Sequence, residues 1–223
     1  MSDGRRYKRE AMGREVAIID YGTGNVASVA QALERLGARV ELAARPSEVM
    51  SADSLVLPGV GAFGDGMRVL KERGLDDALM EYSLTGRPLL GICLGMQLLF
   101  ESGEEFGSTK GLGLLPGKVA AIPREGEGRA RKVPHVGWSA VTPPNGQDWT
   151  GSILDGVLPG ESVYFVHSYM AVPDMDSCRI AECDYDGCVV TAAIQEGPLV
   201  GCQFHPEKSG KTGLRIMRNF LKM

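Results

Sequence analysis

A cysteine between two glycines is the residue of this chain best suited to nucleophilic chemistry. Cys93 lies in Gly91-Ile92-Cys93-Leu94-Gly95, where the apolar residues 88–90 give way to the helix-like segment 96–100. A nucleophile at a sharp strand-to-helix turn needs small neighbours, because the backbone is tight there and the side chain must stand clear of it. The N-terminus of the following helix also favours the thiolate, which is the reactive form of cysteine. The segment is therefore predicted to be the cysteine form of a nucleophile elbow.

A histidine and a glutamate near the other end of the chain supply a base and a group to orient it. Of the three histidines, His135, His167 and His205, only His205 has a carboxylate two residues later, in His205-Pro206-Glu207. Pro206 disfavours helix at the preceding residue, and an extended segment would place both side chains on one side of the chain. Glu207 could then fix the tautomer of the imidazole beside the thiol. For His135 and His167 we expect structural roles.

A glycine-rich loop follows the apolar segment 54–57. It reads Pro58-Gly59-Val60-Gly61-Ala62-Phe63-Gly64. Glycines leave backbone N–H groups accessible, and an acyl-transfer enzyme needs such donors where negative charge develops on oxygen. The loop is therefore a candidate oxyanion hole, and an ordinary turn is the alternative interpretation.

Length and composition are those of one compact domain. The chain has 223 residues, of which 43% are hydrophobic and 23% charged, so a full core is expected. The net charge of −4 lacks the basic excess of nucleic-acid-binding domains, and no nucleic-acid partner is expected. No stretch reaches the roughly 18 apolar residues of a membrane helix, and the basic residues 1–14 lack the apolar core of a signal peptide. We expect a cytoplasmic protein without a membrane partner, with a disordered extension at residues 1–14 and a single domain over residues 15–223.

Apolar strands alternate with helical segments in the first half of the chain. Strands are predicted at residues 16–19, 39–42, 54–57 and 87–92, and helices at about 26–36, 67–73 and 75–82. Such alternation indicates a parallel sheet covered on both faces. The second half has strands joined mainly by short turns, and then a final helix; these are predicted at residues 117–122, 162–166, 179–185, 189–195, 199–204 and about 212–221. The predicted fold class is α/β with a mostly parallel central sheet.

Two glycine-containing turns imitate nucleotide-binding motifs. Gly22-Thr23-Gly24-Asn25-Val26-Ala27 follows a strand and opens a helix, and Glu41 ends the next strand, as in a dinucleotide-binding fingerprint. Gly210-Lys211-Thr212 resembles the end of a phosphate-binding P-loop, but His205 stands where its first glycine would be. Ordinary turns are the simpler interpretation of both. A non-enzymatic nucleotide-binding module is kept as an alternative function.

Cysteines and a basic loop offer two further candidate sites. Five cysteines in a chain of this size fit a reducing compartment. Cys178, Cys183 and Cys188 lie five residues apart without a C-x2-C pair or an adjacent histidine, so no metal site is expected. A cluster of basic residues is typical of a solvated loop, with contact to a phosphate or an acidic partner as the alternative: Arg124, Arg129, Arg131 and Lys132.

Five segments together resemble the class I, triad-type glutamine amidotransferases. Residues 91–101 and Gln203-Phe204-His205-Pro206-Glu207-Lys208-Ser209 are similar to that superfamily as a whole. Residues 20–25, 134–138 and 164–169 are similar, more narrowly, to the glutamine amidotransferase subunits of imidazole glycerol phosphate synthase. The resemblance extends over about residues 16–221. It implies a flavodoxin-like class I glutamine amidotransferase fold.

The resemblance also implies roles for individual residues. The catalytic triad would be Cys93, His205 and Glu207. The family pattern assigns three further groups. The oxyanion-hole amides would come from Gly59, Val60 and Leu94, and the substrate glutamine would be contacted by Gln97, Ser168 and Tyr169. The partner interface would include Asn25, Trp138 and Lys208.

The activity implied by the resemblance is hydrolysis of glutamine to glutamate and ammonia, with no cofactor. The implied partner is a (β/α)8-barrel cyclase that uses the ammonia to make imidazole glycerol phosphate and the aminoimidazole carboxamide ribonucleotide in histidine biosynthesis. A sister class I amidotransferase subunit of another pathway is the alternative. One position departs from the family pattern, because Ser139 stands after Trp138 where asparagine is usual. This departure puts in doubt any interface hydrogen bond that an asparagine would make.

Overall fold

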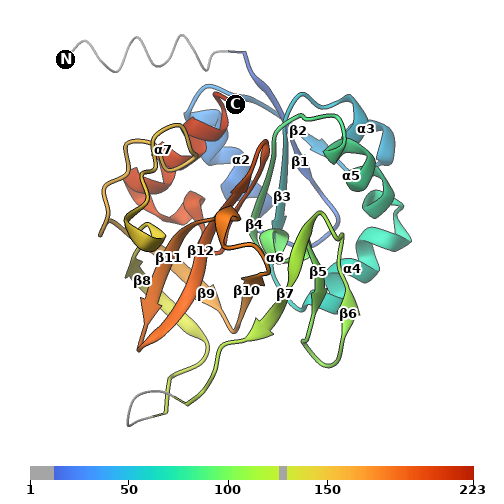
Figure 1. The fold of residues 1–223 in the computed structure, drawn as a ribbon. Coiled ribbons are helices and arrows are strands. Elements are labelled where there is room, and N and C mark those ends of the chain that lie inside the picture. Colours follow the sequence, from blue (N-terminus) through green and yellow to red (C-terminus); the bar gives the residue numbers. More distant parts are fainter. Residues whose placement is uncertain (1–12, 126–129) are drawn as a thin grey trace, which may run out of the picture.

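A seven-stranded sheet forms the centre of the computed structural model, which describes residues 13–125 and 130–223 (Figure 1). The first half of the chain contributes β1 (Glu15–Ile19), β2 (Arg39–Ala43), β3 (Leu55–Gly59) and β4 (Leu89–Cys93). The second half contributes β11 (Arg179–Tyr185), β12 (Cys188–Glu196) and β13 (Leu199–Cys202). In the order β11-β12-β13-β4-β3-β1-β2, all strands from β13 onward pair in parallel, whereas β11 and β12 are antiparallel. The predicted, mostly parallel sheet is confirmed.

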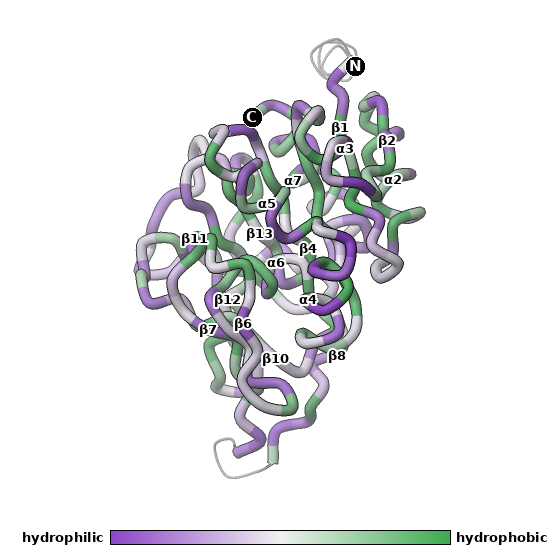
Figure 2. The backbone as a smooth tube through the Cα atoms, turned by 90° about the vertical axis from the view of Figure 1, so that its right-hand side faces the viewer, coloured by the Kyte–Doolittle hydropathy of each residue, from purple (hydrophilic) through white to green (hydrophobic). Residues whose placement is uncertain are grey.

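Helices cover both faces of this sheet, as the alternation of segments predicts. One face carries α2 (Val26–Arg35) and α7 (Gly210–Phe220), and the other carries α3 (Pro46–Ser51), α4 (Phe63–Glu72) and α5 (Leu75–Ser83) (Figure 1). Because side chains alternate along a strand, each face has its own core. Ile18 belongs to the apolar cluster of α2 and α7, and its neighbour Ile19 belongs to that of α4 and α5. Hydrophobic segments accordingly concentrate in the strands, with hydrophilic turns around them (Figure 2).

Two smaller sheets accompany the central one. A four-stranded sheet contains β5 (Phe100–Gly103), β6 (Thr109–Lys110), β7 (Leu115–Ala121) and β10 (Tyr169–Pro173). An antiparallel pair contains β8 (His135–Ala140) and β9 (Ser162–His167). Only Ser168 separates β9 from β10, so the chain passes directly from the two-stranded sheet into the four-stranded sheet at this residue.

The structure corrects the sequence expectation directly after the elbow. The helix-like segment predicted at residues 96–100 is the short α6 (Leu94–Leu98), and Phe100 already begins β5. Phe100 pairs with Leu115 of β7. This tertiary pairing overrides the helical appearance of an apolar run that periodicity cannot distinguish from a strand.

The basic loop between β7 and β8 is only partly solvated. Arg131 is buried, and its guanidinium donates to the backbone carbonyls of Tyr185, Pro123, Glu125 and Asp186. The expectation of a solvated loop is therefore wrong for this residue. Arg129, like residues 1–12 of the expected extension, lies outside the described residues.

The described part of the chain contains no helix long and apolar enough to cross a membrane. It also contains no cluster of three or more side chains suited to hold a metal ion. Cys178, Cys183 and Cys188 are free thiols, in the short turn Asp176–Cys178, in β11 and in β12.

Candidate active site

Cys93 ends β4 in a backbone conformation that few residues other than glycine adopt. Its φ is 54° and its ψ is −111°. The flanking glycines are required by close approach of the backbone. A Cβ atom at Gly91 would lie 2.7 Å from the backbone of Met96, and one at Gly95 would lie 1.8 Å from the carbonyl oxygen of Leu57. The elbow predicted from the sequence is therefore present, with the thiol at the first turn of α6.

Glu207 holds the ring of His205. The His205 Nδ1 and Glu207 Oε1 atoms are 2.8 Å apart, and the two side chains are 3% and 0% exposed. A carboxylate only accepts hydrogen bonds, so Nδ1 carries a proton. The prediction that His205-Pro206-Glu207 is extended is correct for His205 and wrong for the two residues after it. His205 has extended backbone, but Pro206–Lys208 form a tight helical turn, and this turn brings the carboxylate to the ring.

The surroundings of His205 favour the protonated ring. Burial alone would lower its pKa, but interactions with Cys93 and Glu207 outweigh burial and raise the pKa to about 9. Among the described residues, Nε2 of His205 has no hydrogen-bond partner. At neutral pH, His205 is thus an imidazolium with an N–H available beside the sulfur.

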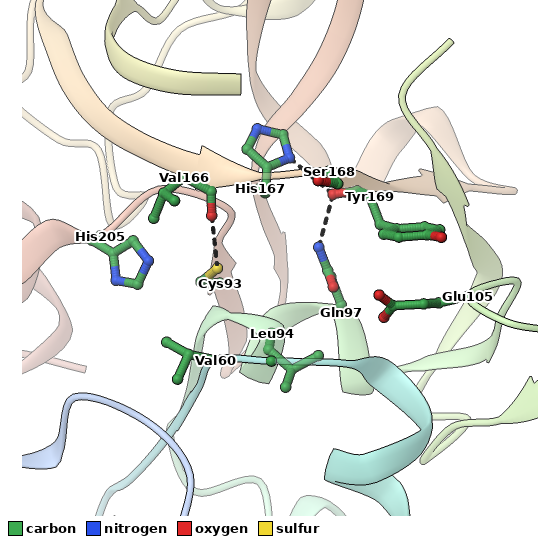
Figure 3. A pocket seen from close by; sticks show the side chains of 11 residues that line it. Val60, Cys93, Leu94, Gln97, Glu105, Val166, His167, Ser168, Tyr169 and His205 are labelled. Carbon is green, nitrogen blue, oxygen red and sulfur yellow. Dashed lines mark hydrogen bonds between the residues drawn. The ribbon is translucent and has the colours of Figure 1, made fainter. Parts of the chain in front are cut away.

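A cavity of about 250 Å³ opens at Cys93. Figure 3 shows His205 on one side of Cys93, and Gln97, Tyr169 and Glu105 on the other. The residues expected from the sequence at the oxyanion hole and the substrate site mostly line this cavity: Val60, Leu94, Gln97, Ser168 and Tyr169. Gly59 is buried directly beside it, paired with Cys93 across β3 and β4.

Gln97 uses its side-chain amide group internally. Its Nε2 donates to the carbonyl oxygen of Tyr169 at 2.9 Å and to Oε1 of Gln203 at 3.0 Å. Both N–H bonds are therefore engaged. The side-chain carbonyl oxygen of Gln97 is the group that remains available to a ligand.

Glu105 is a site residue that sequence reasoning missed. It lies in the turn between β5 and β6, lines the cavity, and accepts a hydrogen bond from the backbone N–H of Phe63 at 2.8 Å. This contact attaches the turn to the start of α4 and leaves a carboxylate at the cavity wall. An acidic residue in a turn is normally solvated, so no local signal in the sequence indicates this position.

His135 and His167 form a buried pair, of which His167 lines the cavity. His167 Nδ1 donates to the carbonyl oxygen of Tyr169 at 2.8 Å, so its Nε2 accepts from His135 Nδ1 at 3.0 Å. His135 Nε2 in turn accepts from the hydroxyl of Ser139 at 2.9 Å. Burial lowers the pKa of both histidines to about 4, so both are neutral. Ser139 thus directs its hydroxyl to a buried imidazole.

An exposed apolar surface adjoins the cavity. We call it the β8–β9 face; it consists of Val136, Trp138, Tyr164 and Val166, which project from one side of the strand pair. Trp138 is 58% exposed. The carbonyl oxygen of Val166 accepts from the thiol of Cys93 at 3.8 Å, which connects this face to the elbow. Of the other expected interface residues, Lys208 is exposed and Asn25 is half-buried.

Comparison with known proteins defines the class. The family model "Glutamine amidotransferase class-I" matches residues 17–223, and the chain belongs to this family of enzymes. The solved structure of PurLQS from Thermotoga maritima has the same fold, with a TM-score of 0.71 at 18% identity, covering 94% of this chain and 98% of that one. A solved glutamine amidotransferase from the same organism gives a TM-score of 0.59 at 19% identity, covering 89% of this chain and 78% of that one.

Curated relatives identify the group within the class. Imidazole glycerol phosphate synthase subunit HisH 1 of Legionella pneumophila (strain Lens) is 47% identical over 210 residues, covering 93% of this chain and 99% of the relative. The HisH subunit of Moorella thermoacetica is 46% identical over 207 residues, covering 93% and 94%. The chain belongs with these HisH subunits.

Proposed function

We propose that this chain is the glutaminase subunit of imidazole glycerol phosphate synthase, with Cys93 as nucleophile, His205 as acid–base group and Glu207 as its orienting carboxylate. The similarity to HisH subunits over nearly the full length supports the reaction and the pathway. The buried 2.8 Å contact between His205 and Glu207, beside a cysteine at a strand-to-helix elbow, is the observation that carries the assignment of the triad.

The mechanism follows from the charge state of the pair. The thiolate of Cys93 attacks the side-chain amide carbon of glutamine, and the imidazolium of His205 gives its Nε2 proton to the departing nitrogen. Ammonia leaves and a γ-glutamyl thioester remains. The neutral ring then takes a proton from water as the water oxygen attacks the thioester. Glutamate departs, and the thiolate and imidazolium are restored.

The oxyanion of each tetrahedral intermediate is stabilised by backbone amides. Leu94 contributes the first amide of α6, where the helix dipole adds to the hydrogen bond. Gly59 and Val60 contribute the amides on the opposite side. Gly59 cannot carry a side chain, because its Cβ would lie 2.6 Å from the hydroxyl of Tyr21 and 2.9 Å from Leu94.

The cavity wall complements a glutamine substrate. The free carbonyl oxygen of Gln97 accepts an N–H of the substrate, and Ser168 and Tyr169 form the adjoining wall. The carboxylate of Glu105 balances the positive charge of the α-ammonium group. No cofactor takes part in this scheme.

The partner in this proposal is the (β/α)8-barrel cyclase, which receives the ammonia. The β8–β9 face, Asn25 and Lys208 form the docking surface. The β8–β9 face is exposed and reaches the cavity through Val166, and Lys208 is an exposed cation that directly follows Glu207. The chain acts in the cytoplasm as a single domain over residues 15–223, without nucleic acid or membrane.

A glutaminase assay tests the function. Glutamate release should be strong only when the cyclase is present together with its nucleotide, the ribulosyl aminoimidazole carboxamide ribotide. Equally strong glutamate release without the cyclase, or no glutamate release under any condition, would contradict the proposal.

A further inference from the structure

Gln203 is a fully buried polar residue whose two side-chain ends reach two residues of the site. It follows β13 and is 0% exposed. Its Nε2 donates to the sulfur of Cys93 at 3.8 Å, and its Oε1 accepts from Gln97 Nε2 at 3.0 Å. Gln203 thus contacts the same sulfur that shares its cavity with His205, two residues further along the chain. Phe204, between them, packs into the core.

The hydrogen-bond pattern fixes which end of Gln203 faces the sulfur. The carbonyl oxygen of Tyr169 can only accept, so the group of Gln97 that contacts it is the amide nitrogen. The second N–H of that nitrogen reaches Gln203, where it requires an oxygen. The amide nitrogen of Gln203 is consequently the end that lies beside Cys93.

The sulfur therefore lies between an acceptor and a donor. As a thiol, Cys93 donates to the carbonyl oxygen of Val166 at 3.8 Å. As a thiolate, it can only accept; the amide nitrogen of Gln203 donates to the sulfur at 3.8 Å, and the ring of His205 lies beside it (Figure 3). A hydrogen bond to the charged form favours that form. The carbonyl oxygen of Val166 favours the thiol of Cys93, whereas the amide N–H of Gln203 favours the thiolate, which is the reactive form.

We propose that Gln203 is a positioning residue with two roles: its amide N–H holds and stabilises the Cys93 thiolate, and its carbonyl oxygen orients Gln97 toward the substrate. The inference rests on the proposed role of Cys93 as nucleophile. Loss of Gln203 acts on the nucleophile and on substrate binding at once, whereas a change at only one of its ends separates the two effects.

Two variants separate these roles. Gln203→Met is similar in length but makes neither hydrogen bond. Gln203→Glu keeps an oxygen for Gln97 but replaces the N–H donor with a negative charge beside the sulfur. Alkylation of Cys93 by iodoacetamide in the isolated full chain measures the first role, after subtraction of the rate of Cys93→Ala. The KM for glutamine in the complex with the cyclase measures the second.

Gln203→Met should slow alkylation at neutral pH by roughly fivefold to tenfold, as expected for one lost hydrogen bond, and should also raise KM. Gln203→Glu should slow alkylation further, move its pH profile to higher pH and lower kcat, with KM near that of the wild type. The matched control is Gln195→Met on β12, whose side-chain oxygen accepts from the backbone of Ile153 at 3.0 Å. It should leave alkylation and KM unchanged.

Circular dichroism establishes that each variant is folded before it is scored. Unchanged alkylation in folded Gln203→Met would overturn the donor role, even if Gln203→Glu did not fold. An equal rise of KM in both variants would overturn the role toward Gln97. If Cys93→Ala retained glutamine-dependent synthesis, the proposed function would fail instead, and the alkylation data would still report on the contact between Gln203 and the sulfur.

Discussion

Replacing Glu207 by glutamine measures how strongly the carboxylate stabilises the protonated ring of His205, which is the form that the proposed mechanism requires. The contact is a buried hydrogen bond of 2.8 Å between a charged donor and a charged acceptor. A hydrogen bond to a charged group contributes about 1.5–3 kcal/mol, and one pH unit corresponds to about 1.4 kcal/mol. Glu207→Gln should therefore lower the pKa of His205 from about 9 by about one to two units.

Histidine NMR titration of the full chain is the assay. The chain has three histidines, and burial lowers the pKa of His135 and His167 to about 4, so the ring that titrates near pH 9 is His205. Its midpoint should move to lower pH in Glu207→Gln. An unchanged midpoint would refute the reasoning that the carboxylate holds the imidazolium.

The same pKa predicts how folding stability depends on pH. The ordinary pKa of 6.5 applies to the unfolded chain, and the folded value is about 9, so the stabilising contribution is complete below about pH 6.5. It is lost as the pH rises through about 9, and amounts to at most about 3 kcal/mol. Urea unfolding across this range should show the decline in the wild type and a smaller decline in Glu207→Gln. Equal declines would contradict the linkage.

Three further predictions concern the elbow, the oxyanion loop and the interface. Gly95→Ala should destabilise the fold by more than about 3 kcal/mol in thermal unfolding, because its Cβ would lie 1.8 Å from a backbone oxygen; Gly64→Ala, with its nearest atom at 3.4 Å, is the control and should cost little. The isolated chain should hydrolyse glutamine about 10²–10³ times more slowly than the complex, since the loop at Gly61, with φ of 105° and no neighbour within 4 Å of its Cβ position, has room to turn an oxyanion amide on docking. Full-rate glutamate release by the isolated chain would refute this gating. The family resemblance implies that Lys208 pairs with an acidic residue of the cyclase. Lys208→Ala should therefore weaken assembly or uncouple glutamate from imidazole product, because such a carboxylate, left buried and unpaired, costs roughly 2–5 kcal/mol. An unchanged ratio of glutamate to imidazole product, together with an unchanged affinity for the cyclase, would show that Lys208 is only a solvated surface residue.

The elbow and the central sheet could be predicted because their signals are local. The glycines around Cys93 indicate a tight turn, because no other residue fits there. The short apolar runs of the strands in the first half are also distinct from the amphipathic pattern of the helices between them. The same locality explains why the contact of His205 with Glu207 can be anticipated although its backbone geometry cannot.

The remainder of the site depends on contacts between distant segments. Gln97 and Gln203 are 106 positions apart, and only the fold reveals that their amides meet. Glu105 becomes a cavity residue because the backbone of Phe63 attaches its turn to α4. Ser139 contacts the imidazole of His135, four residues away on the same strand. The sequence does not indicate this contact, because it shows neither that His135 is buried nor that its ring reaches Ser139.

Activity of Cys93→Ala in the complex tests the central claim most directly. In the proposed mechanism, Cys93 is required to release ammonia from glutamine and has no role once ammonia is free. Synthesis of imidazole glycerol phosphate should therefore disappear with glutamine as the nitrogen donor and stay close to the wild-type rate with ammonium salt. Retained glutamine-dependent synthesis, or equal loss of both activities in a folded and assembled variant, would contradict the account.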